Sequence, residues 1–117
     1  MKKMALDRNL VYKLLKQVPE GKVASYKGLA KAAGHPNAAR AVGGMMRRNP
    51  YAPSVPCHRV VYSDGRLGGF NGLSGIKDKV RILAKEGVRV KDGRIVDFEK
   101  LYFADFSLKL TRKARLP

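Results

Sequence analysis

Residues 25–50, with the sequence SYKGLAKAAGHPNAARAVGGMMRRNP, constrain the possible fold most strongly, because they match two short helices joined by a tight turn. Ser25 is placed to cap the first helix, whose apolar side includes Leu29. Gly34-His35-Pro36 breaks that helix, and Asn37 is placed to cap the second. The pattern predicts a helix-turn-helix.

The second of these helices has two different sides when its residues are spaced at about 100°. The side expected to face the core carries Ala38, Ala41, Val42, Met45 and Met46. The opposite side carries Arg40, Gly43, Gly44 and Arg47. Exposed glycines destabilise a helix by roughly 1 kcal/mol each relative to alanine. A flat surface between two arginines favours contact with DNA over a crossing helix packed on the glycines.

Two further helices are expected on either side of this unit. Leu10 to Val18 have apolar residues at helical spacing and are followed by Pro19 and Gly21. The other helix covers about residues 77–85 and ends at Gly87. Its inward residues are expected to be Val80, Leu83 and Ala84.

Two Asp-Gly pairs between short apolar runs indicate tight β-hairpins, one at Asp64-Gly65 and one in the sequence VRVKDGRIVDF. The basic segment of about residues 108–117 is expected to fray. With 117 residues, the chain fits one domain. The expected fold is α+β but mainly α: a single winged helix-turn-helix-like domain over residues 1–117, with short β-hairpins.

The charge balance predicts a polyanionic partner. Lys and Arg number 25 against 9 Asp and Glu, which gives a formal net charge of +16. Nucleic acid is favoured over an anionic membrane surface, because no basic amphipathic helix with bulky apolar anchors is present. One cysteine, no apolar leader and no long apolar run lead us to expect a cytoplasmic protein, associated with the nucleoid through DNA, and no membrane partner.

The single cysteine lies in the sequence SVPCHRVV, residues 54–61. Prolines at positions 53 and 56 stiffen its approach, and His58 and Arg59 place positive charge nearby. Such charge lowers the pKa of a thiol and favours the nucleophilic thiolate, whereas a lone cysteine elsewhere is commonly buried filler. Neighbouring side chains on a strand point to opposite faces, so cooperation of Cys57 with His58 requires a turn or a bridging water. One cysteine and two histidines cannot close a structural zinc site.

Four segments together identify a family resemblance. SYKGLAKAAGHPNAARAVGGMMRRNP, VPCHRVV, DGRLGGFNG and KEGV resemble, in order and spacing, the DNA-binding and active-site domain of the O6-alkylguanine-DNA alkyltransferases. The resemblance extends from about Val23 to Val88. It implies direct repair of double-stranded DNA: a flipped O6-alkylguanine loses its alkyl group to a cysteine, irreversibly and once per molecule. No cofactor and no metal are implied.

The resemblance assigns roles to individual positions. Cys57 is the alkyl acceptor, His58 deprotonates it through water, Glu86 orients His58, and Asn49 holds the turn before the active loop. Arg40 corresponds to the finger that replaces the extruded base, and Tyr26 to the tyrosine that pushes on a phosphate. Small residues suit docking in the minor groove. The implied interface residues are Tyr26, Ala38, Ala39, Arg40, Ala41 and Gly43. Arg47, on the same side of the second helix as Arg40, is expected to contact DNA as well. The implied pocket residues are Met46, Val60, Gly68, Gly69, Phe70, Asn71 and Gly72.

The sequence departs from the family pattern at three places. Phe70 stands where a tyrosine that hydrogen-bonds to the leaving oxygen is usual, so the backbone N–H of Asn71 has to do more. The segment between this aromatic residue and Lys79 is two residues longer than usual. The usual N-terminal domain of the family is absent from this sequence.

Two other functions fit parts of the sequence. A short chain also resembles the alkyltransferase-like proteins, which bind alkylated guanine without repairing it but lack the cysteine. A winged-helix regulator that reads a base sequence fits the helix-turn-helix alone. The preferred interpretation is a single-turnover methylated-DNA–protein-cysteine methyltransferase, acting as a monomer, with other DNA-repair proteins as possible partners.

Overall fold

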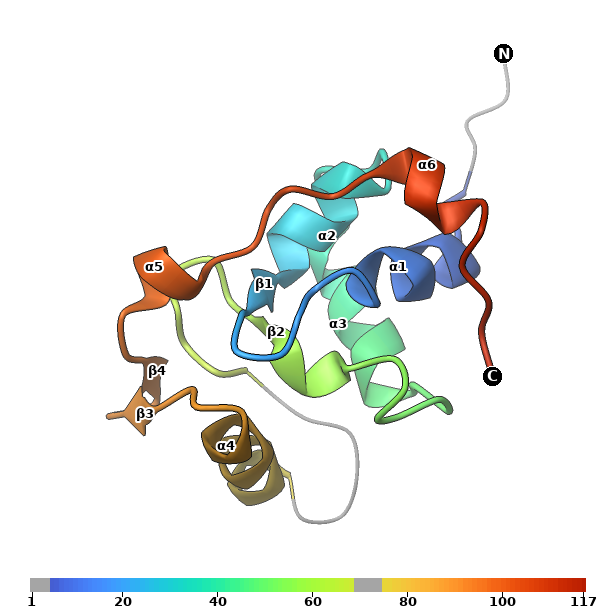
Figure 1. Ribbon diagram of the computed structural model, residues 1–117. Helices are drawn as coiled ribbons and strands as arrows, with labels where there is room; N and C mark the ends of the chain where they lie inside the picture. The colour runs from blue at the N-terminus through green and yellow to red at the C-terminus, as the bar shows by residue number, and fades with distance from the viewer. Residues whose placement is uncertain (1–4, 69–74) are drawn as a thin grey trace.

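The computed structural model describes residues 5–68 and 75–117, which form a mainly helical domain with short strands. This confirms the predicted α+β, mainly α fold. Figure 1 shows α1, α2 and α3 gathered on one side and α4 with a hairpin on the other. In chain order the elements are α1 (Arg8–Leu15), β1 (Ala24–Ser25), α2 (Tyr26–Ala32), α3 (Ala39–Arg47), the 3-10 helix η1 (Cys57–Arg59), β2 (Val60–Val61), α4 (Ile76–Lys85), β3 (Val90–Lys91), β4 (Arg94–Ile95), α5 (Phe98–Leu101) and α6 (Leu108–Thr111).

Helices α2 and α3 form the predicted helix-turn-helix and pack against each other, with α1 beside them (Figure 1). Ser25 caps α2 as predicted, because its Oγ accepts a hydrogen bond from the backbone N of Gly28 at 2.9 Å. The predicted cap at Asn37 is wrong. Ala38 occupies the N-cap position without a side-chain hydrogen bond. The turn before α3 is closed by a backbone hydrogen bond from Ala38 N to His35 O. Asn37 therefore lies one residue before the N-cap position.

The predicted sides of α3 are correct only in part. Val42 and Met46 are buried, as expected. Gly44, predicted to be exposed, is buried, and Ala41, predicted to face the core, is exposed. The guanidinium of Arg48 lies over Gly44, about 3.1 Å from the place of a missing Cβ, and it covers this part of the helix. Gly43 stays half-buried, and a Cβ there would lie 3.9 Å from both Arg47 and Tyr26, at ordinary contact distance.

The strand pairing differs from the prediction at one hairpin and agrees at the other. The turn at Asp64-Gly65 exists, with Tyr62 N donating to Arg66 O at 2.8 Å. Its flanks do not pair with each other as strands, because β2 pairs in parallel with β1 and Arg66 bridges to Arg94. The second hairpin is confirmed: β3 and β4 pair antiparallel around Asp92 and Gly93, both with positive φ.

Helix α4 confirms the predicted second amphipathic helix, but its buried side differs. Leu83 is buried and Val80 packs at the edge of a cluster formed by Val23, Val61, Leu67, Leu83, Val88 and Ile95. Ala84, predicted to point inward, is exposed. Lys79, one turn before Leu83, is fully buried instead. The helix thus places a charged residue on the side that periodicity assigns to apolar ones.

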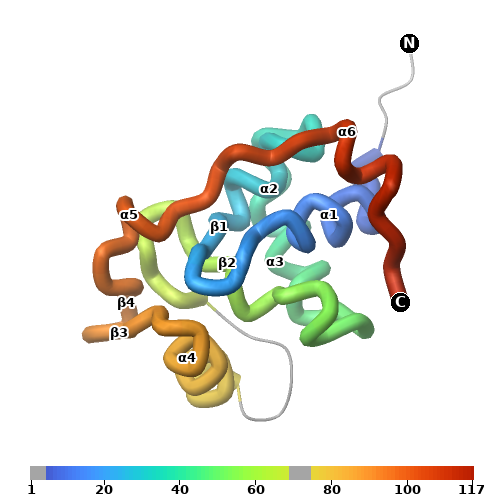
Figure 2. The backbone as a smooth tube through the Cα atoms, viewed as in Figure 1, coloured from blue at the N-terminus to red at the C-terminus, as the bar shows by residue number. Residues whose placement is uncertain are grey.

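The C-terminal part of the chain forms a strap, residues 101–107, across β1 and α1. Val23 N donates to Leu101 O, and Phe103 N donates to Val23 O at 2.7 Å. Figure 2 shows this segment continuing over the molecule to α6 beside α1. Residues 108–117 were expected to fray, but they include α6, a buried Thr111 and a Leu116 packed against the main core.

Within the described residues, no helix combines the length and the apolar character that crossing a membrane requires.

Candidate active site and nucleic-acid interface

Cys57 lies at the start of η1, directly before β2, at a backbone turn. This is the turn that the sequence required for Cys57 and His58 to act together. Asn49 supports the loop before it: its Nδ2 donates to Val55 O at 2.8 Å, and its Oδ1 accepts from Tyr51 N at 2.9 Å. Asn49 and Cys57 are both buried, and Cys57 is only 2% exposed. A reacting group therefore has to come to the sulfur inside the protein.

His58 and Glu86, separated by 28 residues in sequence, form a hydrogen bond between Nε2 and Oε2 at 3.0 Å. Arg59 binds the same carboxylate with two nitrogens, Nε at 2.9 Å from Oε1 and Nη2 at 2.7 Å from Oε2. Its Nη1 donates to Val18 O at 2.8 Å. Arg59 therefore holds Glu86 in the orientation in which it contacts His58.

The pKa of Cys57 is raised and not lowered, contrary to the sequence prediction. Burial raises the pKa of the Cys57 thiol above its usual value, and a hydrogen bond with Asn49 and the charge of Lys79 only partly oppose this. Arg59, expected to act on the thiol, is bound to Glu86 instead. The thiol is thus protonated at neutral pH and needs a base.

His58 is suited to be that base. Burial lowers the pKa of His58 below its usual 6.5, although the hydrogen bond with Glu86 opposes this shift. The imidazole is therefore neutral at pH 7 and able to accept a proton. Glu86 remains ionised: burial raises the pKa of its carboxyl, but hydrogen bonds from Arg59 and His58 outweigh burial and lower it.

Lys79 is a buried cation next to this group that the sequence analysis missed. Its Nζ donates to Val60 O at 2.6 Å, to Leu67 O at 2.7 Å and to the hydroxyl of Tyr26 at 3.4 Å. Burial lowers the pKa of Lys79 to about 7, and the nearby Cys57 opposes the shift. Its spacing of four residues from Leu83, on the inward side of α4, is the signal that could have revealed it.

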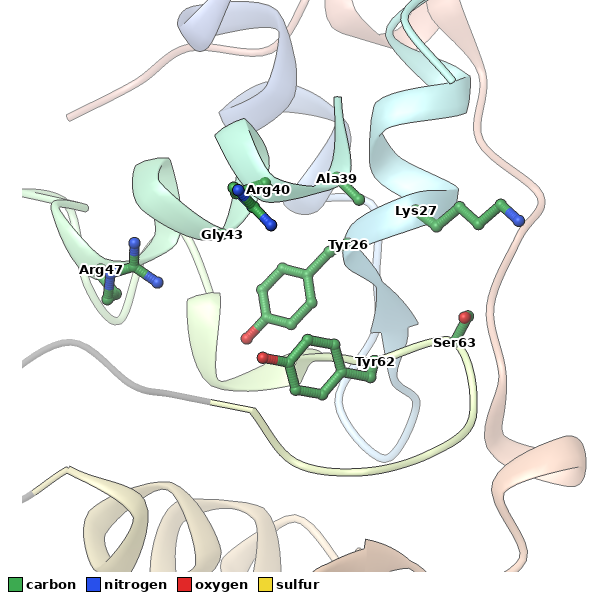
Figure 3. A pocket seen from close by; sticks show the side chains of 8 residues that line it. All are labelled: Tyr26, Lys27, Ala39, Arg40, Gly43, Arg47, Tyr62 and Ser63. Carbon is green, nitrogen blue, oxygen red and sulfur yellow. The ribbon is translucent and has the colours of Figure 1, made fainter. Parts of the chain in front are cut away.

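A surface cavity of about 380 Å³ lies between α2, α3 and the loop after β2, as Figure 3 shows. Five of the residues predicted to contact DNA line it: Tyr26, Ala39, Arg40, Gly43 and Arg47. Three further lining residues, which the sequence analysis did not select, are Lys27, Tyr62 and Ser63. No acidic residue is among these eight. The cavity therefore has the charge and shape to receive part of a nucleic-acid strand.

The other predicted residues occupy different positions. Ala38 is half-buried and Ala41 is exposed beside the cavity residues of α3. Met46 and Val60 are buried and, like Cys57, do not line the cavity. Gly68 has a φ of +71°, and a Cβ there would lie 2.9 Å from the hydroxyl oxygen of Tyr26, so the position requires glycine. Gly69, Phe70, Asn71 and Gly72 lie outside the described residues.

Tyr26 links the cavity to the buried residues. Its side chain lines the cavity, and its hydroxyl reaches Lys79. Burial raises the pKa of Tyr26 to about 12, with the nearby Tyr62 and Cys57 adding to the shift. Its phenol therefore stays protonated at neutral pH and can donate a hydrogen bond.

Known proteins are similar in sequence to this chain over much of its length. The human methylated-DNA–protein-cysteine methyltransferase is 52% identical over 86 residues, which cover 74% of this chain and 41% of that protein. A bifunctional methyltransferase/endonuclease of Thermoplasma volcanium is 40% identical over 96 residues, or 82% of this chain and 30% of that protein. The chain thus spans less than half the length of these two curated relatives.

Solved structures agree with the fold. S. pombe Atl1, in complex with damaged DNA containing O6-carboxymethylguanine, superposes with a TM-score of 0.74 and 28% identity, covering 86% of this chain and 98% of that one. The O6-methylguanine-DNA methyltransferase of Pyrococcus kodakaraensis has a TM-score of 0.61 and 49% identity, covering 69% and 46%.

The family model for the DNA-binding domain of 6-O-methylguanine DNA methyltransferase matches residues 8–88. This range includes the helix-turn-helix, Cys57 and the carboxylate that contacts His58. The chain therefore belongs to the O6-alkylguanine-DNA alkyltransferase family.

Proposed function

We propose that this protein repairs DNA directly, by transferring the alkyl group of an O6-alkylguanine irreversibly to Cys57. The observation that carries the proposal is the 3.0 Å contact between Glu86 and His58, the residue that follows the buried Cys57 in the chain. A structural cysteine needs no neighbouring base with a partner that orients it, whereas an activated nucleophile does. Relatives named as methylated-DNA–protein-cysteine methyltransferases support the same reaction.

In the proposed step, neutral His58 takes the proton of Cys57 through a water molecule, and Glu86 stabilises the resulting imidazolium. The thiolate attacks the alkyl carbon bound to O6. The new S–C bond forms as the C–O6 bond breaks, and the bonding electron pair passes to guanine, which takes up one proton. The products are a thioether on Cys57 and unmodified guanine, so each molecule reacts once.

The interface supports extrusion of the damaged base. Arg40 is exposed on α3 at the cavity and is the residue we assign to the space that the base vacates. Ala39 and Gly43 have no bulky side chains, so that side of α3 is able to approach the minor groove closely. Extrusion costs a few kcal/mol and least for a poorly paired base, so an alkylated guanine is favoured over guanine. We also propose that the protein acts as a monomer in the cytoplasm, on nucleoid DNA.

Mass spectrometry after incubation with a duplex containing O6-methylguanine tests the proposal. We expect the mass of one methyl group on the peptide that contains Cys57, with loss of the lesion from the DNA. Undamaged duplex and a Cys57→Ser variant are the controls. An unchanged protein mass, with the lesion still present after prolonged incubation, contradicts the proposal.

A second function, recognition of alkylated guanine without repair, is favoured by the overlap with S. pombe Atl1, of which the match covers 98%. It predicts selective binding of the lesion with no transfer. Cys57 argues against it, because alkyltransferase-like proteins lack this cysteine. The same mass measurement distinguishes the two functions.

A further inference from the structure

Tyr62 is an exposed aromatic side chain at the cavity for which the helix-turn-helix has no structural need. It is 45% exposed, whereas Tyr26 is 7% exposed. The two ring centroids are 5.3 Å apart, with the ring planes inclined by 60°. Figure 3 shows both rings on the same side of the cavity, facing the arginines of α3. Together they form an aromatic wall, which we define as Tyr26 and Tyr62.

The ring of Tyr62 is held in place without any ligand. The guanidinium of Arg66 lies 5.0 Å from its ring centroid, and Arg66 is itself bound to Asp64 at 2.8 Å. The backbone of Gly68 is so close that a Cβ there would lie 3.1 Å from Cε2 of Tyr62. A side chain positioned in advance loses little conformational entropy when it binds.

The charges opposite the aromatic wall identify the chemistry of the ligand. Lys27, Arg40 and Arg47 line the same cavity. Aromatic side chains next to a basic groove bind single-stranded nucleic acid, because the rings contact bases or sugars while the cations hold phosphates. A cavity of about 380 Å³ with this lining fits one nucleotide of an opened strand.

The aromatic wall also connects the cavity to buried Lys79, through the hydroxyl of Tyr26. Tyr26 lines the cavity on one side and reaches Lys79 with its hydroxyl, and Lys79 and Cys57 affect each other electrostatically. We propose that Tyr62 is a further DNA-binding residue, whose ring contacts the sugar and base of the nucleotide extruded toward Cys57. This inference rests on the proposed repair function and adds a residue to its interface.

The test compares Tyr62→Ala and Tyr62→Phe in a Cys57→Ser background, which binds DNA but cannot accept an alkyl group. Loss of one base–aromatic contact corresponds to about a tenfold change in affinity. We expect Tyr62→Ala to weaken binding to the O6-methylguanine duplex about tenfold and binding to undamaged duplex about twofold or less. Tyr62→Phe keeps the ring and should bind as the parent does. Leu110→Ala, at an exposed apolar residue on α6, is the matched control.

A fluorescent base placed opposite the lesion reports extrusion directly, and its signal should fall in Tyr62→Ala at saturating protein. Equal affinity of Tyr62→Ala and the parent for the lesion overturns the proposal. An equal loss on damaged and undamaged duplex overturns it too, because the contact then involves unopened DNA. Should Tyr62→Ala have a lower melting temperature, Tyr62→Leu, which preserves apolar packing, decides by the same criteria.

Failure of the repair function is detected separately. The binding experiment uses protein without Cys57, so its result does not depend on alkyl transfer. If Tyr62→Ala selectively loses lesion binding while the protein with Cys57 intact is not methylated, the Tyr62 contact is supported and the repair reaction is rejected.

Discussion

At the scale of single residues, the site depends on where its protons lie. Cys57 keeps its proton because it is buried, and His58 is neutral for the same reason. Glu86 stays charged because Arg59 binds it. Burial thus opposes ionisation of the sulfur and keeps the imidazole neutral. In the proposed reaction, Glu86 stabilises the imidazolium only once proton transfer has occurred.

Lys79 leads to a prediction about stability and pH. Its pKa is about 7 in the folded protein against a usual 10.5, so the unfolded chain binds more protons between these values. The free energy of unfolding therefore decreases as pH falls from 10.5 to 7, because burying the protonated amine of Lys79 is unfavourable. Between pH 7 and 8.5, the parent should gain stability relative to Lys79→Met, by at most about 1.4 kcal/mol per pH unit.

Denaturant unfolding across this pH range measures the effect. Lys77→Met is the matched control, because Lys77 lies on the same helix but is exposed. Its pH profile should run parallel to that of the parent. Parallel profiles for Lys79→Met as well would show that Lys79 has a normal pKa.

At the scale of elements, Gly43 lowers the stability of α3 but adds no side chain to the surface at the cavity. The place of a Cβ on Gly43 has nothing closer than 3.9 Å, so alanine fits there. Gly43→Ala should therefore raise the free energy of unfolding by up to about 1 kcal/mol. Since the added methyl group lies in the cavity beside Arg47 and Tyr26, it should weaken DNA binding.

Gly68→Ala is the contrasting variant, because its positive φ and the nearby Tyr26 hydroxyl leave no room. It should destabilise the protein. Thermal melting and DNA titration of both variants check the prediction. A Gly43→Ala variant that binds DNA as tightly as the parent would mean that the α3 surface does not approach the DNA closely.

At the scale of the whole molecule, the net charge of +16 is expected to govern the proposed encounter with DNA. The affinity should fall steeply with salt, because each neutralised phosphate contributes about 0.9 to the slope of log K against log salt. Arg47→Ala should reduce this slope by roughly one and weaken binding to all sequences alike. Lys109→Ala, on α6 away from the cavity, should leave the slope unchanged. Filter-binding or anisotropy titrations at several salt concentrations measure it.

Local sequence determined the elements of this protein well, because capping and turn formation involve neighbouring residues. Ser25 at the start of α2 and Asp92-Gly93 between β3 and β4 behave as short-range rules predict. The helix-turn-helix and the amphipathic α1 follow from periodicity. The resemblance of the segments PCHRV and KEGV to a known family identified His58 and Glu86 as site residues. No local rule could have paired these two residues, which are 28 positions apart.

Only the tertiary structure decided which environment each side chain meets. The burial of Lys79 and Gly44, the exposure of Ala41 and Ala84, and the raised pKa of Cys57 depend on segments distant in sequence. The aromatic wall joins α2 to the loop after β2, so neither segment alone reveals it. The reason is physical: hydrogen bonds within a turn depend on adjacent residues, whereas desolvation and ion pairing depend on everything that packs nearby.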